Sequence, residues 1–138
     1  MYELPKDLND LLHAQYFPRL YFYDIETEIS DEFPDPKIAK QMVTSISVVG
    51  PDMSCIVYGL HRLSEESQQL FKTRYLNWIK ENEFARNYLE TKLGNKEPKV
   101  LYQMFATEEE MIRHFFTKIM PNVPAIGGWN SYNFDWRY

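Results

Sequence analysis

The sequence has little cysteine, few histidines and no excess of positive charge. Cys55 is the only cysteine among 138 residues, which excludes an internal disulfide and a cysteine-based zinc site and fits a reducing compartment best. The formal net charge of −5 excludes a strongly basic polyanion-binding protein, although local basic patches or bound cations still permit contact with nucleic acid. The three histidines, His13, His61 and His114, have no ligand spacing among themselves.

Long apolar runs are also lacking. None approaches the roughly 18 residues of a membrane span, and residues 1–15 lack the layout of a signal peptide. We therefore expect a soluble cytoplasmic protein. What the sequence does have is 44% hydrophobic and 16% aromatic residues, enough for one sizeable core, so one compact domain is expected.

The pattern of hydrophobic residues predicts several strands. Residues 20–26, LYFYDIE, are typical of a strand that is buried on both faces over most of its length. Residues 42–50 and 53–59 predict a hairpin around the tight turn Gly-Pro-Asp, and further strands are expected at KVLYQMF and VPAIGGWN. Ahead of them, leucines at helical spacing predict a short helix or packing arm within residues 1–19.

Two stretches between these strands predict helices. Residues 64–93 are rich in Glu, Gln, Lys and Leu and predict one or two helices that stop at Gly94. Thr107 and Glu110 form a capping box ahead of apolar residues at helical spacing. The aromatic residues at helical spacing in the first stretch are expected in the core: Trp78, Phe84 and Tyr88. Helices interleaved with strands indicate an α/β domain with a partly parallel sheet, in which ligands usually collect at the carboxyl ends of parallel strands.

Two carboxylates end the first predicted strand. Because strand side chains alternate, Asp24 and Glu26 leave the same face of residues 20–26. Carboxylates this close repel one another, so keeping both ionised needs water, a cationic partner or a metal ion. Hard divalent cations such as Mg²⁺ or Mn²⁺ bind carboxylate oxygens, so the pair indicates a metal site, with a solvated strand end as the alternative. The pattern Asp-x-Glu is short enough to occur by chance.

The last predicted strand ends in further polar residues. The stretch GWNSYNFD supplies Asn130 and a third carboxylate, Asp135, at another strand end, where three carboxylates can converge. Taken alone, Asp135 also fits a helix N-cap or first-turn acid. The combination of the two strand ends favours a metal site more than either does alone.

These stretches together resemble a known family. DIE at 24–26 and N-x-x-x-F-D at 130–135 look like the first two exonuclease motifs of family B DNA polymerases. DIETEISDEFPDPKIAK and EEEMIRHFFTKIMPNVPAIGGWN resemble their counterparts in T-even-type phage polymerases. The resemblance implies the 3′–5′ exonuclease (proofreading) domain, an RNase H-like (DnaQ-like) α/β fold with a central mixed sheet of about five strands flanked by helices.

The resemblance also implies roles for individual residues. Asp24 would bridge two metal ions, Mg²⁺ or Mn²⁺, Glu26 would bind one of them and orient the attacking water, and Asp135 would hold the second. An aromatic residue would wedge between the last bases of the strand, and two polar residues would lie near the terminal nucleotide. These substrate-binding positions are Phe33, Thr27 and Asn130. From the residues alone, Phe33 also fits an exposed loop aromatic, and the two polar residues fit local turn bonds.

The expected activity is hydrolysis of the 3′-terminal phosphodiester, with release of deoxynucleoside monophosphates, in the proofreading region of a replicative polymerase. Expected partners are the 3′ end of single-stranded DNA, the remaining polymerase domains of a parent chain and, through that chain, a sliding clamp, with no membrane partner. The family's third motif lies downstream of the second, so residues 20–138 are expected to form the N-terminal part of the domain, with weak or no activity. The alternatives are a free-standing exonuclease acting on DNA or RNA and an inactive nucleic-acid-binding module.

Overall fold

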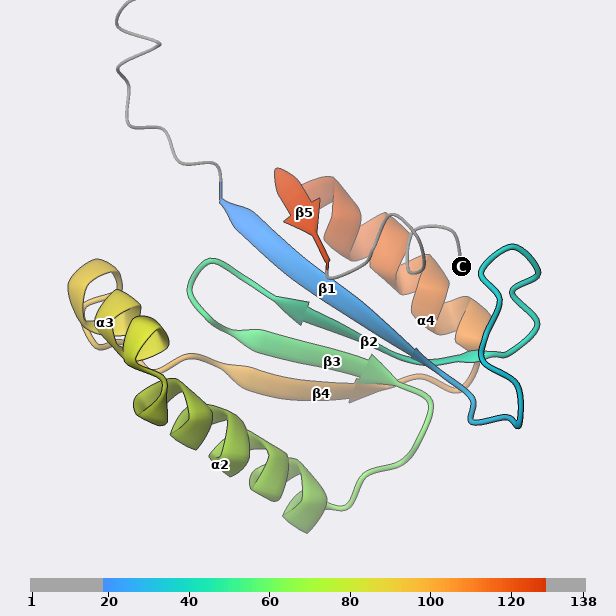
Figure 1. Ribbon diagram of the computed structural model, residues 1–138, viewed down its shortest axis with the longest axis horizontal. Helices are drawn as coiled ribbons and strands as arrows, with labels where there is room; N and C mark the ends of the chain where they lie inside the picture. Colours follow the sequence, from blue (N-terminus) through green and yellow to red (C-terminus); the bar gives the residue numbers. More distant parts are fainter. Residues whose placement is uncertain (1–18, 129–138) are drawn as a thin grey trace, which may run out of the picture.

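One mixed sheet of five strands organises the computed structural model, which describes residues 19–128. The strands, in chain order, are β1 Leu20–Thr27, β2 Val43–Val49, β3 Cys55–Gly59, β4 Val100–Met104 and β5 Ala125–Gly127. Their spatial order is β4-β3-β2-β1-β5, with β2 antiparallel to both neighbours and the β1–β5 and β3–β4 pairs parallel. Every predicted strand is present. β1, β3, β4 and β5 run in the same direction, and the carboxyl ends of β1, β3 and β4 lie at one end of the sheet, whereas the shorter β5 ends at Gly127, opposite Phe22 (Figure 1).

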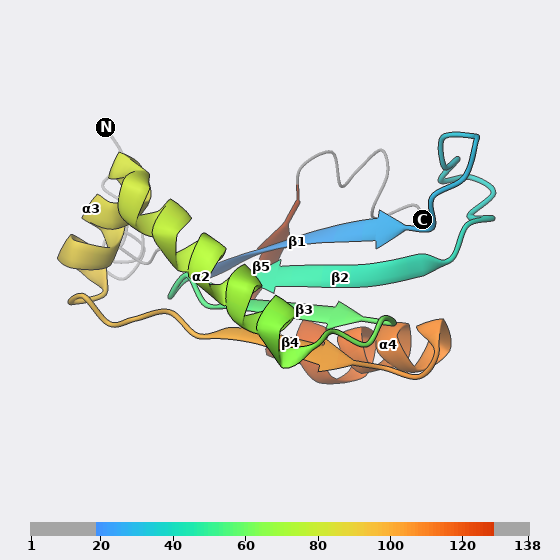
Figure 2. The same ribbon diagram turned by 90° about the horizontal axis from the view of Figure 1, so that it is seen from below.

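Helices lie on the two faces of this sheet. α2 (Glu65–Glu81) and α3 (Glu83–Lys92) lie on one side, and α4 (Glu108–His114) lies on the other (Figures 1 and 2). α4 continues into a π-helical turn, η1 (Phe115–Ile119), and a 3-10 turn, η2 (Met120–Asn122), so the helix predicted after Thr107 is regular only as far as His114. No helix between residues 19 and 128 has the length and apolar character that a membrane crossing requires.

Polar side chains determine where the helices begin. Thr107 accepts a hydrogen bond from the amide of Glu110 at 3.2 Å, which confirms Thr107 as the cap of α4. The reciprocal bond of the predicted capping box, from the amide of Thr107 to the carboxylate of Glu110, does not form within residues 19–128. Asn82 accepts one from the amide of Ala85 at 2.9 Å, so it separates α2 from α3, and Ser64 caps α2 in the same way. The first amides of a helix have no partner within it, and these caps satisfy them.

The main core lies between the sheet and the α4 side. Its buried side chains are Tyr23, Val43, Ile46, Val48, Tyr58, Met111 and Phe115. Within the strands these residues occupy the positions that face α4 and η1, as strand alternation requires. The rings of Tyr23 and Phe115, with centroids 6.0 Å apart, join β1 to η1.

β1 is buried on one face only, so the prediction of a strand buried on both faces is wrong. Tyr23 is 6% exposed, whereas Leu20 and Phe22 on the other face are 42% and 53% exposed. α2 contacts β4, at the edge of the sheet away from β1, and therefore leaves this part of β1 uncovered (Figure 1). The aromatic content of the strand does not reveal which face a helix covers.

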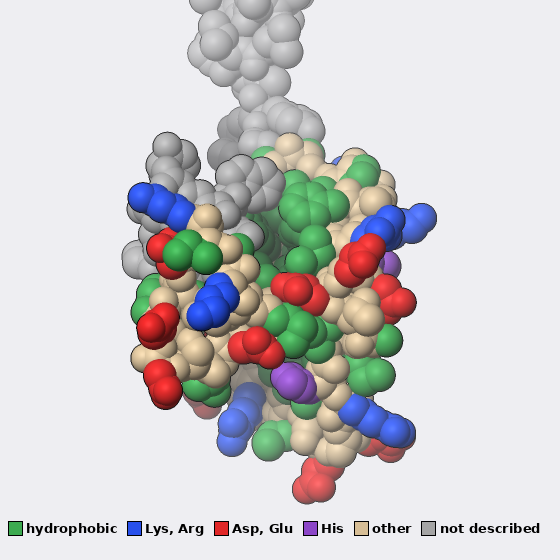
Figure 3. Space-filling model, turned by 90° about the vertical axis from the view of Figure 1, so that its right-hand side faces the viewer, with side chains coloured by type: hydrophobic (Ala, Val, Ile, Leu, Met, Phe, Trp, Pro, Cys, Tyr) green, Lys and Arg blue, Asp and Glu red, His purple; other side chains and the backbone are tan. Residues whose placement is uncertain are grey.

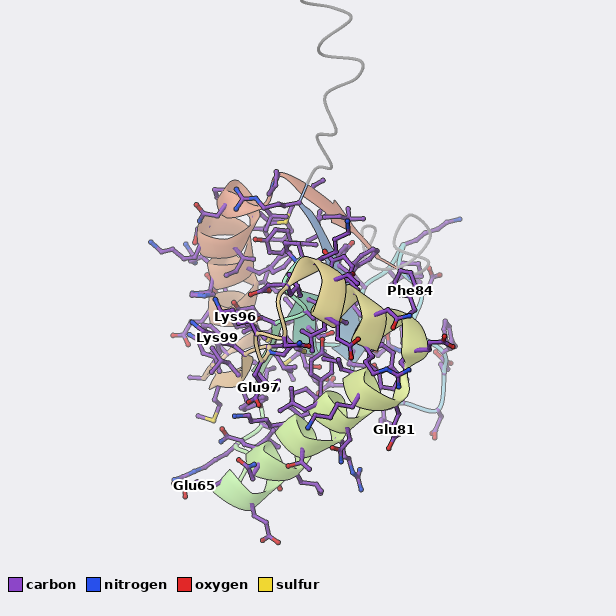
Figure 4. The ribbon with its side chains drawn as sticks, turned by 90° about the vertical axis from the view of Figure 1, so that its left-hand side faces the viewer. Glu65, Glu81, Phe84, Lys96, Glu97 and Lys99 are labelled. Carbon is purple, nitrogen blue, oxygen red and sulfur yellow. The ribbon has the colours of Figure 1, made fainter. Side chains whose placement is uncertain are left out.

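The aromatic residues of α2 and α3 are less buried than predicted. Trp78 and Phe84 are exposed, and Phe84 projects from the start of α3 (Figure 4). Of the three aromatic residues predicted to lie in the core, only Tyr88 is partly buried. The residues that α2 and α3 bury most deeply are Ile79 and Ala85. These helices therefore pack against the rest of the domain through side chains smaller than those of tryptophan and phenylalanine.

The turn between β2 and β3 is held by α2. Tyr75 donates a 2.7 Å hydrogen bond from its hydroxyl to the carbonyl oxygen of Met53 in this turn. Burial of the ring, reinforced by the nearby Cys55 and Asp52, raises the pKa of Tyr75 to about 12. The neutral hydroxyl therefore persists as a donor well above pH 10.

We expect the free energy of unfolding to fall as the pH rises from about 10 to about 12. Because the pKa of Tyr75 is raised from 10.0 to about 12 on folding, its contribution is complete below pH 10 and is lost as the pH approaches 12. The expected loss is about 1–2 kcal/mol once partial exposure of the ring is allowed for. Urea denaturation across this range measures it.

Tyr75→Phe should flatten this part of the pH profile, with a residual slope because burial also raises the pKa of Tyr58. Tyr88→Phe removes another hydroxyl bonded to the same turn, through the carbonyl of Pro51, and controls for loss of a hydrogen bond alone. A Tyr75→Phe profile that superimposes on that of the unaltered chain would contradict the prediction.

Candidate active site

Asp24 and Glu26 lie on the second half of β1 and leave its exposed face. Their side chains point away from the face of β1 that buries Tyr23, so both carboxylates share one face, as strand periodicity predicts. Across the sheet, Ser47 pairs with Asp24 and Ser45 pairs with Glu26. The predicted juxtaposition of the two acids is therefore confirmed.

The residues opposite the two acids are small. Ser45 and Ser47 extend little beyond the backbone, so the surface beside the carboxylates is not filled by larger side chains of β2. At this end of the molecule, acidic side chains lie among hydrophobic ones (Figure 3). Neither serine is among the predicted site residues, although the alternation around the buried Ile46 marks both as lying on the face of the acids.

The two carboxylates fit a divalent cation. Within residues 19–128, neither side chain forms a hydrogen bond or an ion pair, which leaves their oxygens available as ligands. Oxygen donors of this kind are the ligands that hard divalent cations prefer. The same part of the chain contains no group of three or more acidic, histidine or cysteine side chains able to hold a metal. The described residues therefore supply two of the three predicted ligands, Asp24 and Glu26.

Asp135 and Asn130, the predicted contributions of the second motif, lie outside the described residues. The strand that precedes them is described, and β5 pairs in parallel with β1 so that Gly127 lies opposite Phe22. This pairing puts the strand that leads into the second motif directly beside the strand that carries Asp24. The convergence of the three acids stays a prediction.

A hollow of about 420 Å³ opens beside the end of β1. Its lining consists of residues 25–30 together with Glu32, Phe33 and Pro34. Glu26 and Thr27 form the side contributed by β1, and Phe33, 87% exposed, lies on the side contributed by the following loop. Three of the predicted site residues therefore share one hollow that combines carboxylates with an accessible aromatic ring.

Thr27 lies next to an irregularity in the sheet. The register between β1 and β2 shifts between Glu26 and Thr27, so Thr27 pairs with Val43. Its side chain forms no hydrogen bond with any residue in 19–128, so the local turn bond considered for it is absent from this part of the chain. Thr27 lines the hollow, as expected for a residue near the substrate. Its role in substrate binding stays a prediction.

The loop that carries Phe33 has internal hydrogen bonds. The side-chain amide of Gln41 donates to the hydroxyl of Ser30 at 3.0 Å, and that hydroxyl donates to the carbonyl of Glu32 at 2.6 Å. Pro34 further restricts the backbone of Phe33. These constraints hold the exposed ring at the side of the hollow.

A comparison with known protein families matches residues 3–138 to the DNA polymerase family B, exonuclease domain. A comparison with curated proteins gave no match. The mixed sheet flanked by helices agrees with the RNase H-like exonuclease fold, and domains of this family are proofreading 3′–5′ exonucleases that use divalent metal ions. The likeness to the phage type stays a prediction. The match spans nearly all of the sequence, and the chain therefore belongs to the exonuclease-domain family of family B DNA polymerases.

Proposed function

We propose that this chain binds the 3′ end of single-stranded DNA at the carboxyl end of β1 and removes the terminal nucleotide as a monophosphate, as the proofreading region of a replicative polymerase. The observation that carries the proposal is the placement of Asp24 and Glu26 on one exposed face, next to the hollow lined by Thr27 and Phe33. The partners implied by this role are the other polymerase domains and, through them, a sliding clamp.

The carboxylates would hold the metal ions and arrange the reacting groups. Asp24 and Glu26 would ligate Mg²⁺ or Mn²⁺, with Asp135 as a third ligand. Two bound ions supply an activated water and neutralise charge on the leaving 3′ oxygen. Glu26 would orient the attacking water through a carboxylate oxygen, and the small Ser45 and Ser47 would leave space for the phosphodiester.

The exposed loop would bind the base. A ring such as that of Phe33 stacks on any base, and proofreading needs this tolerance because the terminal nucleotide varies. The hollow between this ring and Glu26 would then place the sugar and phosphate near the carboxylates.

Phe33→Ala is expected to weaken the binding of a single-stranded oligonucleotide about 10-fold, because stacking on an aromatic ring contributes roughly 1–3 kcal/mol per base. Fluorescence anisotropy of a labelled oligonucleotide measures the affinity. Ile38→Ala, at an exposed position of the same loop that does not line the hollow, is the matched control. An equal loss of affinity in both variants would reject a specific role for the ring.

A degradation assay tests the proposed function. Single-stranded DNA labelled at its 5′ end, incubated with Mn²⁺, should give a ladder of products shortened by one nucleotide at a time. The assay uses this chain and a longer chain that includes the third exonuclease motif. No metal-dependent ladder from the longer chain would overturn the proposal. Equal degradation of RNA would favour the free-standing exonuclease, and binding without hydrolysis would favour the binding module.

A further inference from the structure

Glu108, the first residue of α4, is linked to the strand beside the candidate site. Its carboxylate oxygen Oε1 accepts a 2.7 Å hydrogen bond from the amide of Val43, which is 65 positions away in the chain. Val43 begins β2 and is buried, so water cannot readily replace this partner. A buried amide left without an acceptor is costly, so Glu108 stabilises the position of the start of β2.

The start of β2 in turn holds the end of β1. Glu26 pairs with Ser45 and Thr27 pairs with Val43, so Thr44 is an extra residue in β2. This arrangement is a β-bulge, which bends a strand and changes the direction of nearby side chains. The hydroxyl of Thr44 donates a 3.1 Å hydrogen bond to the carbonyl oxygen of Glu26. The bulge therefore contacts the backbone of a predicted metal ligand.

A second hydrogen bond joins the backbone segments next to the bulge. The amide of Glu28 donates a 2.9 Å hydrogen bond to the carbonyl oxygen of Met42. Residues 42–44 thus contact the backbone on both sides of Thr27, and Val43 lies between these two contacts. The hydrogen bond from Val43 to Glu108 is the link that connects this arrangement to α4.

We propose that Glu108 is a positioning residue for the candidate exonuclease site, because by holding Val43 it maintains the bulge that orients Glu26 and Thr27. This inference rests on the proposed function. Glu108 is not part of the lining of the hollow, so it acts through Val43 and not on the substrate. Its neighbour Glu109 is exposed and pairs with Arg113 on the surface of the helix, which makes it a matched control.

The first measurement is amide hydrogen exchange in Glu108→Ala, Glu108→Gln and Glu109→Ala. Glu108→Ala is expected to speed exchange at the amides of Val43 and Glu28 about 10-fold, because the bulge opens more often. Glu108→Gln keeps an oxygen acceptor and should stay within about 3-fold of the unaltered chain. Glu109→Ala should leave the exchange rates of these amides unchanged. Unchanged exchange at Glu28 in Glu108→Ala would overturn the inference.

The second measurement is Mn²⁺-dependent degradation of single-stranded DNA at a temperature where all variants are folded. Glu108→Ala should lower kcat about 10- to 100-fold with little change in KM, as expected for loss of a residue that orients a metal ligand, and Glu108→Gln should restore most of it. A Glu108→Ala variant of lower thermal stability but unchanged kcat would show a merely structural role. This measurement uses the longer chain that includes the third exonuclease motif. If that chain is inactive without any substitution, the proposed function fails at that step, and the exchange data alone decide whether Glu108 holds the bulge.

Discussion

Asp24→Ala is expected to lower the rate of Mn²⁺-dependent DNA degradation at least about 1,000-fold, since metal-mediated charge stabilisation contributes several kcal/mol to the transition state. Asp24 is exposed and shares one face of β1 with Glu26, so its removal leaves a single carboxylate there among the described residues. Glu26→Ala should have an effect of similar size. Single-turnover degradation of a labelled oligonucleotide by the longer chain that includes the third exonuclease motif measures the rate.

A direct measurement of Mn²⁺ binding tests the same assignment without relying on catalysis. Asp24→Asn keeps the shape of the side chain but removes its charge, and it should weaken Mn²⁺ binding measured by calorimetry or by the electron paramagnetic resonance of free Mn²⁺. Asp31→Ala removes an exposed carboxylate in the following loop that does not line the hollow, and it serves as the matched control. If Asp24→Ala had the same activity and the same Mn²⁺ affinity as the unaltered chain, the site assignment would be rejected.

Phe115→Ala is expected to lower the free energy of unfolding by about 3–5 kcal/mol, because it leaves a cavity in the main core. Phe115 is 3% exposed, and its ring lies 6.0 Å from that of Tyr23, which faces the core from β1. The substitution therefore removes packing directly beneath the strand that carries Asp24. Urea denaturation followed by circular dichroism measures the loss.

Phe116→Ala is the control for this core prediction. Phe116 is the next residue of the same π-helical turn, but 53% of it is exposed, and its ring contacts Phe115 edge-on at 5.4 Å. Its removal should cost less than about 1.5 kcal/mol, in the range of one aromatic contact. Equal losses in the two variants would contradict the placement of Phe115 in the core and Phe116 at the surface.

Local patterns made much of the fold predictable. The cap formed by Thr107 and Glu110 and the turn at residues 50–52 depend on residues within a few positions of one another, so the sequence contains all that is needed to recognise them. The shared face of Asp24 and Glu26 follows in the same way from the two-residue repeat of a strand. The π-helical turn after His114 was not predicted, because the apolar spacing there is compatible with a regular helix.

The sequence by itself determined the order of the strands and α-helices, and it placed two carboxylates together, because these features arise from short-range periodicity and capping. Only the tertiary structure decided that the face of Leu20 and Phe22 is exposed, since this depends on where α2 packs. It also decided that Ser45 and Ser47 lie opposite the acids and that Glu108 reaches Val43. Strand register and contacts between distant residues depend on the packing of the whole domain, which no local pattern encodes.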